Sequence, residues 1–194
     1  MKVGILGCGW IATKMAEAMH GVEGVECYAV ASRTLEKAEQ FAQMFKFQKA
    51  YGSYEELAED SNVDLIYIAT PHSHHFQNGM LCVENGRNIL VEKAFTITPE
   101  QAKTLLDTAR QKNVFVCEAI WTRFMPAREI INGIISRKEV GDVRSITANL
   151  GYPLMNVERL QNPALGGGSM LDLGVYPINF SMMHAGAEVR SINA

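Results

Sequence analysis

The sequence predicts the α/β class, with a doubly wound parallel sheet followed by a partial α+β domain. Two observations lead to this prediction. Apolar runs of strand length alternate with helical patterns up to about Ile120, and each run is continuously apolar, which is typical of parallel strands covered on both faces. After Ile120 the pattern changes to a helix, an alternating stretch and a glycine-containing loop. We therefore expect one domain over residues 1–120 and part of another over residues 121–194.

The first domain is expected to hold six strands, each a short apolar run. They are Lys2–Leu6, Val25–Ala31, Lys49–Tyr51, Asp64–Ala69, Asn88–Glu92 and Val114–Cys117. Helices fill the intervals, because Thr34, the capping-box pair Ser53 and Glu56, and Thr98-Pro99 are typical helix starts. The helices are expected up to about His20, over Leu35–Phe45, around Glu55–Leu57, over Ser73–Asn85, and from Thr98 to about Gln111.

The second domain reads differently. We expect a helix over Met125–Ser136 and a half-exposed strand over Val143–Leu150, because that stretch alternates in polarity. A loop over Gly151–Gly168 leads to a helix over Ser169–His184, and a further strand begins at Val189.

The composition is that of an ordinary globular protein in water. The 194 residues are 47% hydrophobic and 20% charged, with a formal net charge of −3. The charges are spread along the chain, which argues against nucleic-acid binding, and no long apolar run predicts a membrane span. The four cysteines lie far apart without a CxxC pair, which favours reduced thiols and a cytoplasmic location.

A glycine-rich turn follows the first predicted strand and opens the first helix. It is Gly7-Cys8-Gly9-Trp10-Ile11-Ala12, which matches the pattern G-x-G-x-x-A. Gly7 allows the tight turn, Gly9 lets the backbone approach a pyrophosphate, and Ala12 allows close packing of helix and strand. The helix N-terminus at Trp10 and Ile11 offers free N–H groups to phosphates. The alternative is a tight turn without a ligand, but the strand–turn–helix context favours a dinucleotide-binding Rossmann domain.

The residues after the second predicted strand favour NADP over NAD. An NAD site usually carries an acidic residue at this point, and here the chain reads Ser32-Arg33. Arg33 can pair with a 2′-phosphate and Ser32 can donate a hydrogen bond to it. The alternative is that Arg33 is a solvated surface residue.

Four later motifs, taken with the glycine turn, resemble the Gfo/Idh/MocA oxidoreductase family. They are Ala69-Thr70-Pro71-x-x-x-His75, Val91-Glu92-Lys93, Glu118-Ala119-x-Trp121-x-Arg123-Phe124, and Gly166-Gly167-Gly168-x-x-x-Asp172-x-Gly174-x-Tyr176-Pro177. The last motif is most similar to the branch that contains dihydrodiol and NADP-dependent aldose dehydrogenases. Two departures stand out: Ala94 follows Glu92-Lys93 where the family usually has proline, and the family's C-terminal sheet is larger than residues 121–194 can build.

The resemblance implies hydride transfer between a nicotinamide and a hydroxyl-bearing carbon of a sugar, polyol or trans-dihydrodiol. Its catalytic residues would be Lys93, Asp172 and Tyr176. Tyr176 would exchange the hydroxyl proton, and the Lys93 ammonium would favour the phenolate. Asp172 would accept a substrate hydroxyl or orient Lys93. The alternatives are a solvated lysine, a packing tyrosine and an aspartate that favours a helix start.

The resemblance also implies further contacts with the cofactor. Thr70, Pro71 and His75 would line its nicotinamide end, and Glu92 would contact the nicotinamide ribose. Trp121 and Arg123 would lie near the nicotinamide and the substrate. No metal is expected at the histidines after Pro71, because no matching carboxylate or thiol is spaced to complete a site.

Two expectations concern the whole molecule. An incomplete second sheet leaves an edge and an apolar face, which predicts a homo-oligomer or an aggregation-prone monomer. It also keeps open the alternative that the chain is a truncated, non-catalytic relative that only binds NADP(H).

Overall fold

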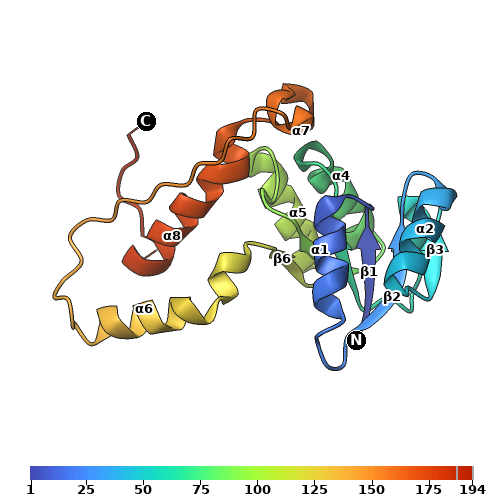
Figure 1. Cartoon of the computed structure of the whole chain (residues 1–194), viewed down its shortest axis with the longest axis horizontal. Helices are drawn as coiled ribbons and strands as arrows, with labels where there is room; N and C mark the ends of the chain where they lie inside the picture. Colours follow the sequence, from blue (N-terminus) through green and yellow to red (C-terminus); the bar gives the residue numbers. More distant parts are fainter. Residues whose placement is uncertain (187, 194) are drawn as a thin grey trace. The chain divides into compact units, whose positions relative to one another are not determined.

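The computed structural model describes residues 1–186 and 188–193 of the chain (Figure 1). It divides into two compact units. The first unit comprises Met1–Ala119 together with Ala164–Gly166, and the second comprises Ile120–Pro163 and Gly167–Ala194. The chain therefore returns to the first unit for three residues before it continues in the second.

The first unit is built on a six-stranded sheet in the order β3-β2-β1-β4-β5-β6. All strand pairs are parallel. The strands are β1 (Lys2–Leu6), β2 (Glu26–Ala31), β3 (Lys49–Tyr51), β4 (Leu65–Ile68), β5 (Asn88–Val91) and β6 (Val116–Glu118). The order reverses between β1 and β4, so the predicted doubly wound sheet is confirmed. In such sheets ligands bind outside the carboxyl ends of the strands at this switch point.

Five helices cover the sheet. They are α1 (Trp10–Met19), α2 (Leu35–Phe45), α3 (Tyr54–Glu59), α4 (His72–Glu84) and α5 (Pro99–Lys112). The Ser53 side chain accepts from the Glu56 amide while the Glu56 carboxylate accepts from the Ser53 amide, which confirms the capping box. The Thr98 side chain caps α5 by accepting from the Gln101 amide, whereas the side chain of Thr34 makes no capping hydrogen bond at α2.

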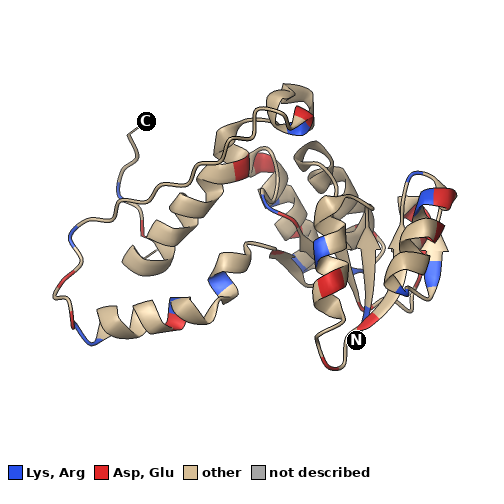
Figure 2. Cartoon of the chain, in the orientation of Figure 1, with Lys and Arg blue, Asp and Glu red and all other residues tan. Residues whose placement is uncertain are grey.

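The buried residues of the first unit form two clusters, because successive side chains of a strand point to opposite faces. Leu6 of β1 belongs to one cluster and Ile5 to the other. Leu57, Cys82 and Leu105 extend the first cluster into α3, α4 and α5, while Ala12, Ala16 and Phe41 extend the second into α1 and α2. Charged residues of both signs lie mixed along α1 and α2 (Figure 2). Both faces of the sheet are thus covered, which fixes the strand ends that carry the site.

The second unit is helical in its described part. It contains a 3-10 turn η1 (Trp121–Phe124), α6 (Pro126–Ser136), α7 (Glu158–Gln161), a π-helical turn η3 (Met170–Gly174) and α8 (Val175–Ala185). A short 3-10 turn, η2 (Pro163–Leu165), lies where the chain passes from the second unit to the first. The predicted helices over 125–136 and 169–184 are confirmed, the latter with the π-helical turn at its start. Pro177 lies in the first turn of α8, so the helix continues through Tyr176.

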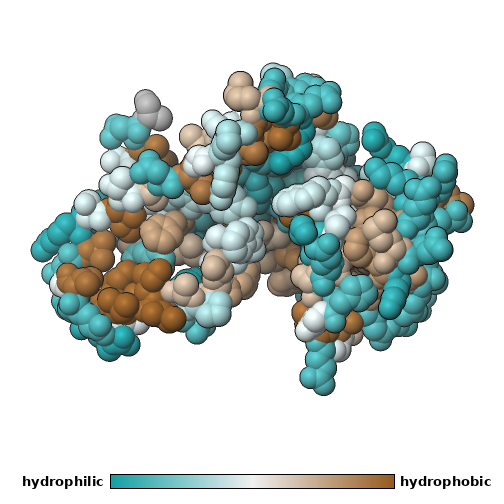
Figure 3. Space-filling view, viewed as in Figure 1, coloured by the Kyte–Doolittle hydropathy of each residue, from teal (hydrophilic) through white to brown (hydrophobic). Residues whose placement is uncertain are grey.

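The predicted strands of the second unit are wrong. Among the described residues of this unit none is in a strand, including those of Val143–Leu150 and the stretch from Val189. A strand needs a hydrogen-bonded neighbour, and this part of the chain supplies none. Apolar side chains remain accessible as a result: Ile130 of α6 is 64% exposed, and Figure 3 shows a hydrophobic area where α6 lies. None of the described helices is long and apolar enough to cross a membrane.

Candidate active site

The glycine turn joins β1 to α1 at the carboxyl edge of the sheet. Gly7 has a φ of +103°, and a Cβ there would lie 3.0 Å from the carbonyl oxygen of Ala69, so only glycine fits. Its amide donates to the Ala31 carbonyl over 2.9 Å, which ties the turn to the end of β2.

Gly9 is the N-cap of α1, and unlike Gly7 it is not required to be glycine by its surroundings in the chain. Its backbone is extended, and a Cβ would meet no described atom within 4 Å. The chain's own packing therefore does not require glycine here. No side chain caps α1 in the described residues, and its first turn holds no acidic residue. The first-turn amides and the open space at Gly9 fit a phosphate group of a dinucleotide.

The end of β2 carries the residues that face an adenosine ribose in this class of fold. Ser32 is buried, with 6% of its surface exposed, and its amide donates to the Tyr51 carbonyl over 3.1 Å. Burial raises the pKa of the neighbouring Cys8 thiol, while a hydrogen bond with Ser32 opposes this shift. Arg33 is exposed and forms no ion pair within the described residues. Its guanidinium is therefore accessible to an anion.

His75 of α4 is fully buried between two loops at the carboxyl edge. Its Nδ1 lies 2.7 Å from the Ala94 carbonyl oxygen and its Nε2 lies 2.8 Å from the Thr70 carbonyl oxygen. Burial lowers the pKa of His75 to about 4, and the two carbonyl contacts oppose this shift. The imidazole thus lies between the loops after β4 and β5, and in its neutral form its single N–H donates to one of the two carbonyl oxygens. The Thr70 hydroxyl in turn accepts from Asn78 Nδ2 over 3.1 Å.

The turn that carries Lys93 follows β5 and is fixed by buried contacts. Glu92 accepts from the Tyr67 hydroxyl through Oε1 and from the Lys93 amide through Oε2, the latter over 3.1 Å. Burial raises the pKa of Glu92. The Lys93–Ala94 peptide is cis, and Glu118 Oε1 accepts from the Phe95 amide over 2.9 Å. Together with His75, these contacts hold Lys93 at the carboxyl edge of the sheet.

In the second unit, Trp121 and Tyr176 form a pair. Trp121 Nε1 donates to Tyr176 Oη over 3.1 Å, and the two rings meet nearly edge to face with centroids 6.4 Å apart. Both line a cavity of about 550 Å³ that also includes Asn149, Tyr152 and Phe180. A tyrosine that lines a cavity and whose hydroxyl already accepts one hydrogen bond is suited to exchange a proton with a bound hydroxyl.

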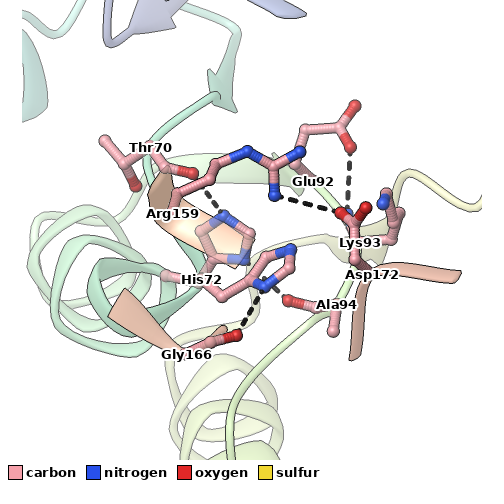
Figure 4. A network of polar contacts seen from close by, with 9 residues as sticks. Thr70, His72, Glu92, Lys93, Ala94, Arg159, Gly166 and Asp172 are labelled. Atoms are coloured by element: carbon pink, nitrogen blue, oxygen red, sulfur yellow. Dashed lines mark hydrogen bonds and ion pairs between the residues drawn. The ribbon is translucent and has the colours of Figure 1, made fainter. Parts of the chain in front are cut away.

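Asp172 and Arg123 have partners of their own in the second unit. Asp172 is only 3% exposed, and its Oδ1 lies 3.0 Å from Nη1 of Arg159 (Figure 4). Arg123 Nε donates to Asn179 Oδ1 over 2.9 Å. The sequence interpretation did not include Arg159, which lies thirteen residues before Asp172 in the short helix α7, within a stretch that the sequence analysis expected to be a loop.

The structure brings together, in the first unit, the glycine turn and the loops that carry Thr70, Pro71, His75, Glu92 and Lys93. It brings together Trp121 and Tyr176 in the second unit. The grouping of Lys93 with Asp172 and Tyr176 stays a prediction, as do the individual roles. Within the described residues no group of three or more His, Cys, Asp or Glu side chains could hold a metal ion.

Two family models match the chain. Residues 1–119 match the model described as "Oxidoreductase family, NAD-binding Rossmann fold", and residues 129–194 match the model of the GFO/IDH/MocA C-terminal domain. The chain belongs to the GFO/IDH/MocA oxidoreductase family. The resemblance seen in the motifs is therefore confirmed, and the first unit contains the family's NAD-binding Rossmann domain.

Similar proteins of this family include dehydrogenases. Trans-1,2-dihydrobenzene-1,2-diol dehydrogenase of Xenopus laevis is 41% identical over 196 residues, a match that covers 100% of this chain and 59% of that protein. D-xylose 1-dehydrogenase (NADP(+)) of Hypocrea jecorina is 43% identical over 202 residues, covering 93% of this chain and 52% of that protein. The chain thus spans little more than half the length of these family members.

Comparison with solved structures agrees with the fold. A 3-ketoreductase from Actinomadura kijaniata, in complex with NADP and TDP-benzene, matches with a TM-score of 0.85 at 26% identity. The match covers 96% of this chain and 57% of that protein.

Proposed function

We propose that the chain takes part in an NADP-dependent dehydrogenase reaction on a hydroxyl-bearing carbon of a sugar, polyol or trans-dihydrodiol. One observation carries the proposal: the N-cap of α1 at Gly9 is open and uncapped, in a family whose Rossmann domain binds NAD-type cofactors. The named relatives, a dihydrodiol dehydrogenase and an NADP-dependent xylose dehydrogenase, support the reaction and substrate classes.

The cofactor would be held by the carboxyl edge of the first unit. The turn Gly7–Ala12 would take the pyrophosphate, and Ser32 with Arg33 would face the 2′-phosphate of NADP. Thr70, Pro71, His75 and Glu92 would lie toward the nicotinamide, with Trp121 and Arg123 near its reactive end. When bound, the nicotinamide supplies the hydride acceptor or donor. NAD is the alternative cofactor.

The chain's own residues would handle the proton. Tyr176 Oη would take the proton of the substrate hydroxyl, since the Trp121 indole N–H already donates to that oxygen and favours its charged form. Lys93 would add a positive charge that stabilises the same phenolate and a developing alkoxide. Asp172 would accept a hydrogen bond from the substrate or from Lys93.

A second candidate function is binding of NADP(H) without catalysis. It is favoured by the second unit, whose described residues form no strand and leave side chains such as Ile130 exposed. The two candidates share the cofactor site and differ in whether Tyr176 has a substrate to act on.

Two measurements test the proposal. The first is fluorescence titration of the chain with NADPH and NADH. We expect Arg33→Ala to weaken NADPH binding roughly 10- to 150-fold, the value of a charged hydrogen bond, and to leave NADH unchanged. Arg110→Ala on α5 is the matched control, because Arg110 is an exposed arginine paired only with Asp107 among the described residues. Absence of binding of either nucleotide refutes both candidate functions.

The second measurement is reduction of NADP⁺ with D-xylose, other aldoses, polyols and trans-dihydrodiols as substrates. Tyr176→Phe is expected to lower kcat about 10²- to 10⁴-fold, as for loss of a general acid–base group. Tyr152→Phe is the control, since Tyr152 lines the same cavity. Binding without reduction of NADP⁺ by any substrate favours the second candidate.

We also propose that the chain is a cytoplasmic homo-oligomer with no nucleic-acid or membrane partner. Exposed apolar side chains of the second unit support self-association, among them Phe124 at 71% and Ile178 at 50% exposure. All four cysteines are free, which fits a reducing compartment. Light scattering after size exclusion gives the oligomeric state directly, and a monomeric mass rules out the oligomer.

A further inference from the structure

Asp172 needs a partner because its carboxylate is taken out of water. The residue is only 3% exposed and lies on η3, one turn before Tyr176. Arg159 supplies one such partner through Nη1, 3.0 Å from Asp172 Oδ1. The Arg159 side chain itself is 44% exposed, so the pair lies at the edge of the second unit with its positive end toward solvent.

The backbone around the two residues is built to bring them together. Gly167 donates to the Asn162 carbonyl over 3.1 Å, and Gly168 donates to the Leu160 carbonyl over 2.9 Å. The amide of Asp172 then donates to the Gly168 carbonyl over 3.3 Å. The helical turn α7 is thus bound directly to the segment that begins η3.

Gly167 is what permits this contact. A Cβ at this position would lie 2.7 to 2.9 Å from the carbonyl oxygens of Arg159, Leu160 and Asn162. Any side chain would push α7 away and carry Arg159 with it. The glycine motif that the family resemblance singled out therefore has a local role in this chain: it allows α7, which carries Arg159, to pack against the backbone that precedes Asp172.

We propose that Arg159 is a positioning residue that keeps Asp172 charged and oriented for the reaction. The proposal rests on the proposed function, in which Asp172 belongs to the catalytic set. A guanidinium at hydrogen-bond distance favours the ionised carboxylate and fixes its plane. Arg159 itself need not contact substrate or cofactor.

The kinetic test compares three variants of one residue. Arg159→Ala is expected to lower kcat about 10- to 100-fold, as a small displacement of a reacting group does, with KM and the Kd for NADPH little changed. Arg159→Lys keeps the charge without the planar fork and is expected to retain an intermediate kcat. Glu158→Gln on the same helical turn and Arg137→Gln after α6 are the controls, both expected to leave kcat unchanged.

Chemical rescue separates positioning from a structural role. Because the Arg159 side chain is partly exposed, millimolar guanidinium can reach its place in Arg159→Ala. We expect guanidinium to restore at least several-fold of the lost kcat and an equal concentration of ammonium to restore less. Equal kcat for Arg159→Ala and the parent chain, or a loss that neither guanidinium nor Arg159→Lys recovers, overturns the proposal.

A measurement that needs no catalysis tests the role of Arg159 independently of the proposed function. The carboxyl ¹³C resonance of Asp172, assigned by its loss in Asp172→Asn, reports the ionisation and surroundings of this group. We expect Arg159→Gln to move this resonance toward the protonated form at fixed pH, with Glu158→Gln leaving it in place. An unmoved resonance overturns the role of Arg159 even if the parent chain is active. A moved resonance in a chain that reduces no NADP⁺ retains the pairing, while the proposed function fails.

Discussion

Gly166 carries the sharpest prediction for stability, because two separate features demand glycine there. Its φ is +71°, in the left-handed region that favours glycine. A Cβ would also lie 2.2 Å from Ile97 Cδ1 and 2.9 Å from His72 Cβ. The carbonyl of Gly166 faces His72 Nδ1 at 3.1 Å, so this residue anchors the returning segment in the first unit (Figure 4).

Gly166→Ala is therefore expected to destabilise through two additive terms. The left-handed backbone costs an alanine about 1–2 kcal/mol. Overpacking against Ile97 and His72 adds about 1–3 kcal/mol, because the neighbours must shift to make room. The sum of roughly 2–5 kcal/mol corresponds to a fall in Tm of roughly 4–20 °C for a chain of this size.

The assay is urea unfolding followed by far-UV circular dichroism, with a control matched in backbone geometry. Gly86 also belongs to the first unit and has a φ of +73°, but a Cβ there meets no described atom within 4 Å. Gly86→Ala is expected to show the backbone term alone, about 1–2 kcal/mol. The difference between the two variants isolates the steric term.

Removing the clashing atom completes the test. Ile97→Val deletes Cδ1, the atom nearest to the added Cβ, and alone is expected to cost about 1 kcal/mol. In the Gly166→Ala background the same change is expected to be neutral or stabilising, a coupling of about 1–2 kcal/mol. Additive effects of the two substitutions, or a Gly166→Ala cost no greater than that of Gly86→Ala, refute the reasoning.

Three further predictions concern the first unit. Burial lowers the pKa of His75 to about 4 from an ordinary 6.5, so below pH 6.5 the unfolded chain takes up a proton that the folded chain does not. The free energy of unfolding should therefore fall by about 2 kcal/mol between pH 7 and pH 5. Urea titrations at the two pH values measure this fall, and the His75→Gln variant should lack it. A folded-state pKa of His75 above 6.5 by NMR contradicts this sign. Ser53→Ala removes the cap of α3 and is expected to cost about 1 kcal/mol in urea unfolding, against no measurable change for Ser136→Ala on α6. Tyr67→Phe leaves the buried Glu92 carboxylate one donor short and is expected to cost about 1–3 kcal/mol; a neutral result means that the pair contributes nothing.

The sheet and its helices follow from the sequence because local and tertiary preferences agree there. The apolar runs that become β1 and β4 are buried on both faces, and Ser53 and Thr98 cap the helices that their positions predict. The stretch Val143–Leu150 lacks this agreement. Its alternation predicts a strand, but a strand is completed only by a neighbour, and pattern alone does not supply one.

The candidate site divides in the same way. The glycine turn can be predicted from the sequence because each glycine meets a backbone requirement at a fixed spacing, as Gly7 shows. The role of His75 as a link between two carbonyls depends on a fold that brings the loops after β4 and β5 together. The sequence does not reveal the role of Arg159 for the same reason. Arg159 reaches Asp172 only because the amides of Gly167 and Gly168 bond to carbonyl groups in and after α7.

Two carboxylates among the candidate residues, the partly buried Glu92 and the buried Asp172, show how environment assigns different tasks to one chemical group. Glu92 accepts from a neutral hydroxyl and a backbone amide, and burial raises its pKa, so its carboxyl group serves best as a fixed acceptor that shapes the Lys93 turn. Asp172 faces the guanidinium of Arg159, which favours the charged form. Pairs of carboxylates in such contrasting surroundings separate into structural and reactive roles. The arginine-paired Asp172 is therefore the better candidate to act on a substrate hydroxyl, and Glu92 is the better candidate to hold the loop that carries Lys93.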